Sequence, residues 1–196
     1  MILGITGAFG CGKSTVLRFF AARSWRVFDA DAVCKSLYDS GDEDVLDAVR
    51  NHFGAAAFTP DGRVNPAALG REAFRDPAKM AALTGVLYPK LTAKLEREIA
   101  ECRRERRNGA FEIPLLYENK FESHFDAVLT VWAPESLRRE RLRGRNFTDA
   151  DVDRRSRMQW SAETKLELAD YAVINTGEPE DLAAQLREFA AAADME

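Results

Sequence analysis

The sequence predicts an α/β fold in which a five-stranded parallel sheet has helices on both faces. Short apolar runs alternate along the chain with longer segments of helical periodicity, the pattern of strand–helix–strand units. The first apolar run, Met1 to Thr6, is continuous and therefore typical of a strand buried on both faces. A glycine-rich turn joins this run directly to a helix-like segment, which favours a parallel sheet with crossover helices.

The turn from Gly7 to Thr15 matches the phosphate-binding pattern G-x-x-x-x-G-K-[ST]. Its glycines allow successive backbone N–H groups to converge on a polyphosphate, and the helix that begins near Lys13 adds its positive end. We expect Lys13 to reach the β- and γ-phosphates of a nucleotide and the Ser14 hydroxyl to coordinate Mg²⁺. The alternative is a glycine-rich turn that is merely capped by Ser14.

The second predicted strand, Trp25 to Phe28, ends at Asp29 and Asp31. Ligands of open α/β sheets bind at the carboxyl ends of the strands. A carboxylate beside the γ-phosphate can orient an acceptor hydroxyl and accept its proton. One of the two acids could instead cap the helix that begins near Ala32, and two acids one residue apart could serve both purposes.

Residues 32–107 are predicted to form a helical insertion between two strands of a single domain whose core is 1–31 and 108–196. Pro89 is among the expected helix breakers, together with glycine- and proline-containing loops. The expected helices are Val33–Tyr38, Asp44–Phe53, Pro66–Phe74, Lys79–Val86 and Leu91–Arg107.

The rest of the core is predicted to alternate strands and helices. The strands are Ala110–Ile113, Asp126–Trp132 and Tyr171–Asn175. An arginine-rich helical stretch, Glu135–Gln159, lies between the last two strands, and an amphipathic helix, Pro179–Ala193, closes the chain.

Arginines outnumber acids in the segment of about 138–157, which we call the lid segment. Arg141 and Arg145 are four residues apart, so they share one helix face and can point together at an anion. Guanidinium groups that close over phosphates stabilise the transferring group and exclude water, and the break from Gly144 to Thr148 gives such a lid a place to bend. The alternative is a solvated basic face.

With these features in place, the chain resembles the dephospho-coenzyme A kinase family over nearly its whole length. The phosphate loop is shared with many nucleotide-binding families, but several other segments match in the family's order. These are Asp29–Asp31, His52–Gly54, Gly62–Asn65 with Leu69 and Phe74, Pro114–Asn119, Arg141-Leu142 with Arg145, Arg155 with Gln159, and Ala169-Asp170 before Ile174-Asn175.

The resemblance implies a P-loop kinase core with a helical substrate-binding insertion and an arginine-bearing lid. It also implies transfer of the γ-phosphoryl of ATP, with Mg²⁺, to the ribose 3′-hydroxyl of dephospho-coenzyme A, the last step of coenzyme A biosynthesis. Asp31 corresponds to the general base, acting with Lys13 and Arg141. The residues implied to bind ATP are Gly10, Cys11, Gly12, Lys13, Ser14, Thr15, Arg141, Arg145 and Asn175, and those implied to hold the acceptor are Asp29, Asp31, Asn65, Pro89, Leu115 and Glu118.

The chain departs from the family pattern at four positions. Tyr88 stands where the family usually has His, and Pro66 stands where an Arg commonly follows the Asn. Both lie in the insertion, so they concern contacts with the acceptor. Arg138 replaces a frequent Gln, and Glu112 replaces a frequent Asp.

Two other functions share part of this pattern. A P-loop kinase acting on a nucleoside or nucleotide would have the loop and the lid without the combined insertion motifs. A GTP-dependent switch is suggested only by Asn119-Lys120-Phe121-Glu122, which ends in Glu, and no glycine of the chain has an Asp three residues before it, as a D-x-x-G motif requires.

Composition limits the environment and the partners. A net charge of −4 argues against a general nucleic-acid or anionic-membrane binder, although it leaves room for local basic patches. The small-molecule substrate is what the family resemblance implies. The three cysteines include no C-x-x-C pair, so free thiols in a reducing compartment are expected. The apolar N-terminus is too short for a signal-peptide core, and a cytoplasmic protein is predicted. The sequence leaves the oligomeric state open.

Overall fold

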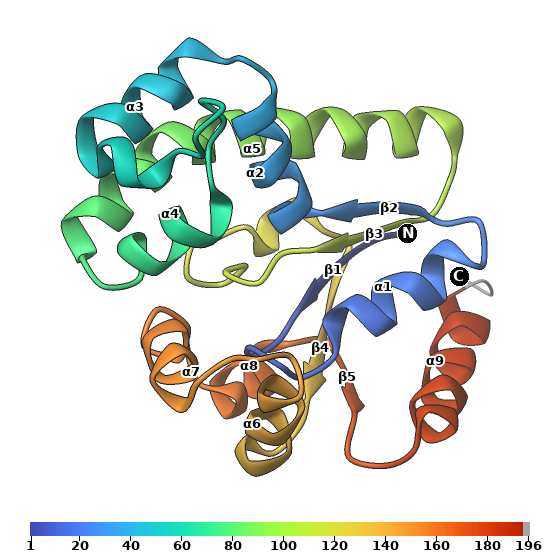
Figure 1. The fold of residues 1–196 in the computed structure, drawn as a ribbon. Helices are drawn as coiled ribbons and strands as arrows, with labels where there is room; N and C mark the ends of the chain where they lie inside the picture. The colour runs from blue at the N-terminus through green and yellow to red at the C-terminus, as the bar shows by residue number, and fades with distance from the viewer. Residues whose placement is uncertain (194–196) are drawn as a thin grey trace. The chain divides into compact units, whose positions relative to one another are not determined.

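The structure is a computed structural model that describes residues 1–193 (Figure 1). The chain forms two compact units. The first consists of Met1–Phe28 and Ile99–Glu196, and the second of Asp29–Glu98. The predicted insertion, 32–107, overlaps most of the second unit, and the helix that ends this insertion continues into the first.

The first unit contains the five-stranded sheet, with strand order β2-β3-β1-β4-β5. Strand β1 pairs in parallel with β3 and β4, and β4 pairs in parallel with β5, which confirms the predicted sheet. Each strand begins and ends within a single residue of its predicted bounds. The strands are β1 Ile2–Thr6, β2 Arg26–Asp29, β3 Gly109–Glu112, β4 Ala127–Trp132 and β5 Tyr171–Ile174.

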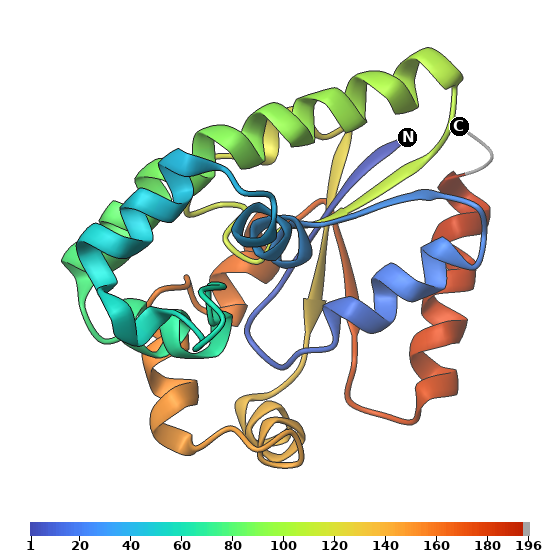
Figure 2. The same cartoon turned by 45° about the horizontal axis from the view of Figure 1, so that its top comes forward.

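Helices cover both faces of this sheet, as predicted. Leu3 and Ile5 of β1 are fully buried against apolar residues of α1, Lys13–Ala21, and α9, Pro179–Ala193 (Figures 1 and 2). Gly4 faces the opposite side, where a side chain would come within 2.6 Å of the Phe125 ring. The short helix α8, Ala162–Leu168, contacts β4 on this second side.

Helix α8 was not expected from the sequence, although its N-terminus carries a clear signal. The Ser161 hydroxyl accepts a hydrogen bond from the Thr164 N–H, the usual arrangement of a serine N-cap. The lid segment also forms helices: α6, Glu135–Arg143, and α7, Asp149–Ser156, separated by the predicted break. Thr148 and Asp151 form a reciprocal capping box at the start of α7.

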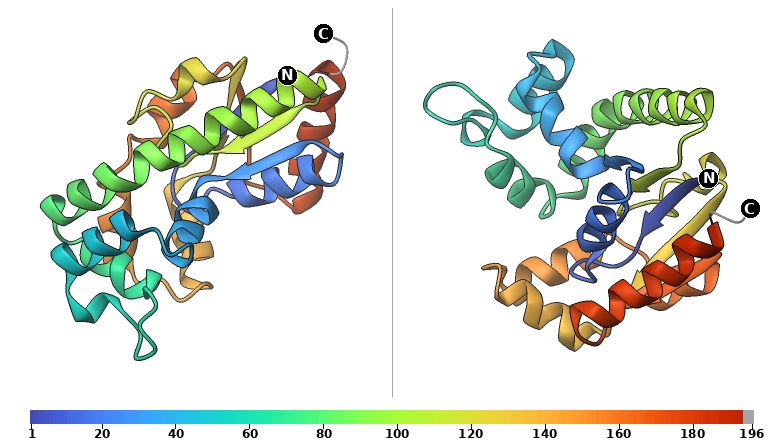
Figure 3. Two further views of the ribbon diagram at one scale, coloured as in Figure 1. Left: turned by 90° about the horizontal axis from the view of Figure 1, so that it is seen from above. Right: turned by 90° about the vertical axis from the view of Figure 1, so that its right-hand side faces the viewer.

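The prediction that Pro89 ends a helix is wrong. Helix α5 runs without interruption from Pro77 to Glu105 and contains Pro89 (Figure 3). Proline inside a helix costs about 3 kcal/mol. The residues Leu83, Leu87, Leu91, Leu95 and Ile99 recur every four positions and are all buried. Each of these side chains gains about 1.5–3 kcal/mol on burial, so together they outweigh the proline.

The second unit is built from helices around its own apolar core. Besides the first part of α5, it contains α2 Ala30–Asp39, α3 Glu43–Phe53, the short 3₁₀ helix η1 Ala55–Ala57 and α4 Pro66–Ala73. Its core includes Val45, Val49 and Leu69. The Lys90 ammonium lies 2.7 Å from the Asp42 carboxylate and joins α5 to the N-terminus of α3.

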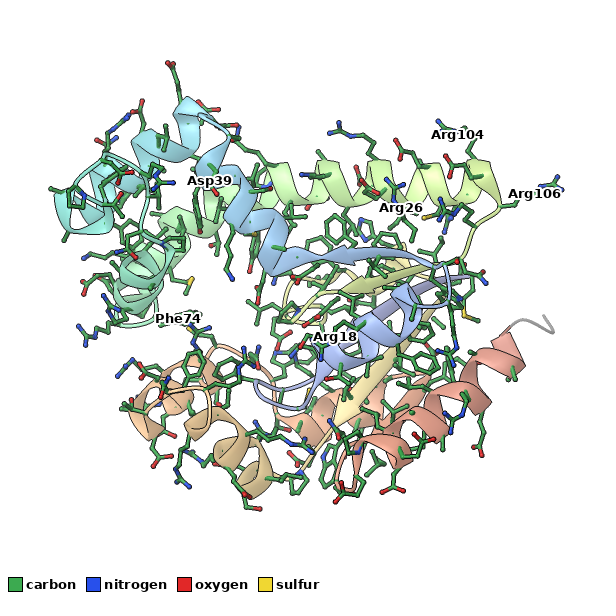
Figure 4. The ribbon with its side chains drawn as sticks, turned by 45° about the vertical axis from the view of Figure 1, so that its right-hand side comes forward. Arg18, Arg26, Asp39, Phe74, Arg104 and Arg106 are labelled. Carbon is green, nitrogen blue, oxygen red and sulfur yellow. The ribbon has the colours of Figure 1, made fainter. Side chains whose placement is uncertain are left out.

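Arg104 and Arg106 are exposed where α5 ends (Figure 4). No helix within residues 1–193 is long and apolar enough to cross a membrane. At the sheet edge, the Gln185 side-chain amide accepts a hydrogen bond from the Ile174 N–H at 2.8 Å and donates one to the Ile174 carbonyl at 2.9 Å.

Candidate functional site

The phosphate loop between β1 and α1 has a backbone that requires its glycines. Gly7, Gly10 and Gly12 have φ angles of 144°, 84° and 103°, which side chains disfavour. A side chain at Gly10 would also come within 2.8 Å of Leu142, and one at Gly12 would collide with the Asn175 amide. The predicted glycines therefore provide both the shape of the loop and the space around it.

Lys13 is held beneath this loop. Its ammonium group donates hydrogen bonds to the carbonyls of Gly7 at 3.0 Å and Ala8 at 3.2 Å, and the residue is 7% exposed. These bonds use two of the three N–H donors of a lysine. Ser14 is exposed in the first turn of α1, and Thr15 accepts a hydrogen bond from Arg18 at 3.0 Å.

Asn175, directly after β5, connects the loop to the lid segment. Its amide donates to the Cys11 carbonyl at 2.8 Å and accepts from Nη2 of Arg141 at 3.2 Å. The other terminal nitrogen of Arg141, Nη1, is buried and has no hydrogen-bond partner within residues 1–193. A buried guanidinium N–H without a partner is costly, so this atom marks a place for an anion beside the loop.

Two side chains that the sequence did not single out as site residues hold Phe9 at the tip of the loop. Arg138 is buried and donates to the Phe9 carbonyl and to the Ala133 carbonyl, both at 3.1 Å. The Phe9 N–H donates to Oε1 of Gln159 at 3.0 Å. Both polar groups of one loop residue are therefore bound, one by the first residue of the lid segment and the other by Gln159, two residues after its end.

An aromatic contact adds to this attachment. The Phe9 and Phe147 rings meet edge to face, with centroids 5.2 Å apart. The Arg155 guanidinium lies 4.9 Å from the Phe9 centroid and 5.3 Å from the Phe147 centroid, within the range of cation–π attraction. Arg155 thus contributes packing at the loop tip as well as charge.

Three further arginines of the lid segment, Arg139, Arg143 and Arg154, are bound to acids. Arg139 reaches Glu135 at 2.7 Å, Asp153 at 2.6 Å and Asp149 at 3.5 Å, and hydrogen bonding to the first two raises its pKa. Arg143 binds Asp149 at 3.1 Å and lowers the pKa of that carboxyl. The cluster therefore combines a set of side chains against the loop with an ion-paired outer set. Arg145 is exposed, with its guanidinium 6.0 Å from the Phe147 centroid.

The loop after β3 carries two predicted acceptor residues, Leu115 and Glu118, both half-buried. The Glu118 carboxylate has two partners at one oxygen: Lys165 lies 2.9 Å from Oε1, and the Trp160 N–H donates to the same oxygen at 2.7 Å. Lys165 is fully buried and had no sequence signal, because one lysine in a short helix is usually exposed.

The remaining predicted site residues lie in the second unit. Asp29 caps α2, because its carboxylate accepts from the Ala32 N–H at 2.9 Å. This leaves Asp31, exposed in the first turn of α2, for other chemistry. Burial raises the pKa of the Cys34 thiol to about 12, and the two carboxylates add to the rise. Asn65 caps α4, and Pro89 is exposed. The functional roles of these residues stay predictions.

Comparison with known proteins gives a consistent result. Residues 1–181 match a family described as dephospho-CoA kinase. A dephospho-CoA kinase of Anaeromyxobacter dehalogenans is 36% identical over 184 residues, which cover 93% of this chain and 87% of the relative.

Solved structures show the same fold. The protein TT1252 of Thermus thermophilus superposes with a TM-score of 0.79 at 32% identity, over 97% of this chain and 96% of the other. A dephospho-CoA kinase of Campylobacter jejuni has a TM-score of 0.71 at 20% identity, over 97% and 95% of the two chains. The chain therefore belongs to the dephospho-CoA kinase family and has a P-loop kinase fold.

Proposed function

We propose that this protein transfers the γ-phosphoryl group of ATP to the ribose 3′-hydroxyl of dephospho-coenzyme A, producing coenzyme A and ADP. Membership of the family supports the reaction. The observation that carries it is the pairing of Lys13, held beneath the loop, with Arg141, whose buried Nη1 lacks a partner within residues 1–193. Two cations beside one loop suit a polyphosphate donor.

The loop residues suit Mg·ATP. Gly10, Gly12 and the first turn of α1 present backbone N–H groups to the phosphates, and Ser14 offers an exposed hydroxyl to the metal ion. When bound, Mg²⁺ neutralises the charge on the β- and γ-phosphates. Asn175 keeps Arg141 next to Cys11 and would lie near the bound nucleotide.

Asp31 is the proposed general base. Its carboxylate accepts the proton of the 3′-hydroxyl as the oxygen bonds to the γ-phosphorus, and the bond from that phosphorus to the β–γ bridging oxygen breaks to release ADP. Its exposure in the first turn of α2, close to the end of β2, and the use of Asp29 as a cap support this role. Arg141, with Arg145, would stabilise the charge on the transferring group.

The second unit is proposed to select the acceptor. Asn65 and Pro89 belong to it, and Leu115 would add a contact from the loop after β3. Tyr88 and Pro66, which depart from the family pattern, give this chain its own acceptor surface. A cytoplasmic location and the absence of nucleic-acid partners stay predictions from the sequence.

The reaction is tested by incubating the protein with Mg·ATP and dephospho-coenzyme A and measuring ADP release together with the mass of the product. We expect ADP in equal amount to coenzyme A. A panel of nucleosides and nucleotides supplies the rival acceptors. Phosphorylation of a nucleoside without formation of coenzyme A would overturn the proposal. Hydrolysis of GTP but not of ATP, with no acceptor phosphorylated, would favour a switch protein.

The base is tested with Asp31→Asn, which keeps the shape of the side chain but cannot accept the proton. General-base catalysis contributes about 10²–10⁴-fold, so kcat should fall by that order while ATP binding, measured by calorimetry, is retained. The matched control is Asp39→Asn at the other end of α2, which should leave kcat unchanged. Normal turnover in Asp31→Asn would remove Asp31 as the base.

A further inference from the structure

Lys165 is the most deeply buried charged side chain of the described chain that the proposed reaction does not use. It lies on α8 with no exposed surface, and its ammonium donates to the Pro114 carbonyl at 2.6 Å and to Oε2 of Glu118 at 3.2 Å. Burial lowers the pKa of Lys165, Glu118 opposes this shift, and the charge of Lys13 adds to it. A buried charge is tolerated where such partners compensate it.

Two sets of hydrogen bonds connect the partners of Lys165 to the phosphate loop. The Pro114 carbonyl also accepts a hydrogen bond from the Thr6 hydroxyl at 3.4 Å, and Thr6 is the last residue before the loop. Glu118 accepts from the Trp160 N–H at 2.7 Å. One residue earlier, Gln159 accepts from the Phe9 N–H at 3.0 Å. The junction Gln159-Trp160 is therefore bound both to the loop tip and to the Lys165 ion pair.

An aromatic contact supports the same junction. The Trp160 ring stacks on Tyr117 with an interplanar angle of 4° and centroids 6.2 Å apart. Tyr117 precedes Glu118, so this loop contacts Trp160 through a ring and a carboxylate. Trp160 is nevertheless 46% exposed, so apolar burial alone does not fix its position.

We propose that Lys165 is a positioning residue that acts through Glu118 to fix the Gln159-Trp160 junction. This junction in turn holds Phe9, and the end of the lid segment that precedes Gln159, in place for ATP. Glu118 then acts through Lys165 and Trp160 rather than as a direct contact of the acceptor. The inference rests on the proposed function only for its effect on turnover. The attachment of the junction to the loop is a property of the free protein.

The first test is local and needs no substrate. In Lys165→Met the apolar stem remains and the charge is lost, so Glu118 loses its counterion. Hydrogen exchange, followed by NMR or by mass spectrometry of short peptides, should become about tenfold faster at the Phe9 and Trp160 amides, as expected for the loss of a charged hydrogen bond. The Arg187→Met variant, which breaks a surface ion pair with Glu180 in the same unit, is the matched control and should leave both amides unchanged.

The second test is kinetic. Lys165→Met should lower kcat/KM for ATP about tenfold. Lys165→Arg, which restores the charge, should recover most of it. If Lys165→Met does not fold, Glu118→Gln provides the same measurements, because it removes the charge and keeps the side-chain size. Unchanged exchange at Phe9 and Trp160 in a folded variant overturns the inference. A wild-type protein that makes no coenzyme A overturns the proposed function and leaves the exchange result valid.

Discussion

The two faces of helix α6 carry the same residue type in opposite surroundings. Arg138 and Arg141, on the face toward the phosphate loop, donate to main-chain carbonyls and to an asparagine amide. Arg139 and Arg143, on the other face, are bound to carboxylates. Neutral acceptors leave the guanidinium charge uncompensated and available to phosphates, whereas carboxylates cancel it. The partner, rather than the residue type, therefore separates arginines suited to catalysis from those that stabilise the lid segment.

The largest effect expected from this comparison is that of Arg141→Met. Removing one charged donor from a phosphoryl-transfer site costs about 100-fold or more in kcat. Steady-state kinetics should show this loss, with ATP binding affected less. Arg141→Lys keeps the charge but not the forked donors, so its kcat should be intermediate. Turnover equal to wild type in Arg141→Met would place Arg141 outside the machinery.

Arg138→Met should have a smaller and different effect. It removes two hydrogen bonds and leaves the carbonyls of Phe9 and Ala133 without this partner. A loss of about 1–3 kcal/mol in the free energy of unfolding is expected, measured by denaturant titration. ATP affinity should fall with it because Phe9 belongs to the loop. An unchanged unfolding midpoint would show that Arg138 is dispensable for the loop.

On the outer face, Arg139→Gln should change little. The three carboxylates that the half-buried Arg139 binds are exposed, and ion pairs near the surface contribute weakly. The melting temperature should therefore fall by no more than about 2 °C, and kcat should stay within about twofold of wild type. Differential scanning calorimetry and the coenzyme A assay measure the two quantities. A loss of kcat similar to that of Arg141→Met would contradict the distinction between the two faces.

The smallest effect is a dependence on pH that only the outer face should show. The pKa values of Asp149 and Asp151 are lowered from 3.8 by hydrogen bonding to Arg143 and Thr148 respectively. Carboxyls with lowered pKa values stabilise the fold above pH 3.8, and this stabilisation is lost as the pH falls through their values in the folded protein. The difference in melting temperature between wild type and Arg143→Gln should therefore be present above pH 3.8 and shrink as the pH falls below it, because Arg143 is the main cause of the lowered pKa of Asp149. That of Arg138→Met should persist, because carbonyl acceptors do not titrate.

The parts of the site that could be predicted from the sequence depend on local patterns. The glycines and Lys13 of the loop occupy fixed positions of a short motif, and their geometry follows from a strand, a turn and a helix in succession. The cap formed by Asp29 was open to prediction for the same reason, since capping involves residues three apart. The strand bounds followed from apolar runs of the expected length.

The parts that could not be predicted depend on contacts between residues far apart in the chain. Arg138 binds Phe9 across 129 positions, and Lys165 binds Glu118 across 47. No local pattern distinguishes these cations from surface ones. The prediction that Pro89 ends a helix failed for the opposite reason. The local rule that proline breaks helices was outweighed by the burial of a long apolar face of α5. Helix α8 was recognisable only from the N-cap at Ser161.

The side chain of Gln185 has a consequence for the sheet as a whole. Its amide occupies both hydrogen-bonding groups of Ile174 on the edge strand β5, as the peptide group of a neighbouring strand would. An extended segment from another molecule therefore finds its donor and acceptor at Ile174 already engaged. The protein thus limits strand addition at this edge, a common route to aggregation, with a single glutamine and without a further strand or a proline.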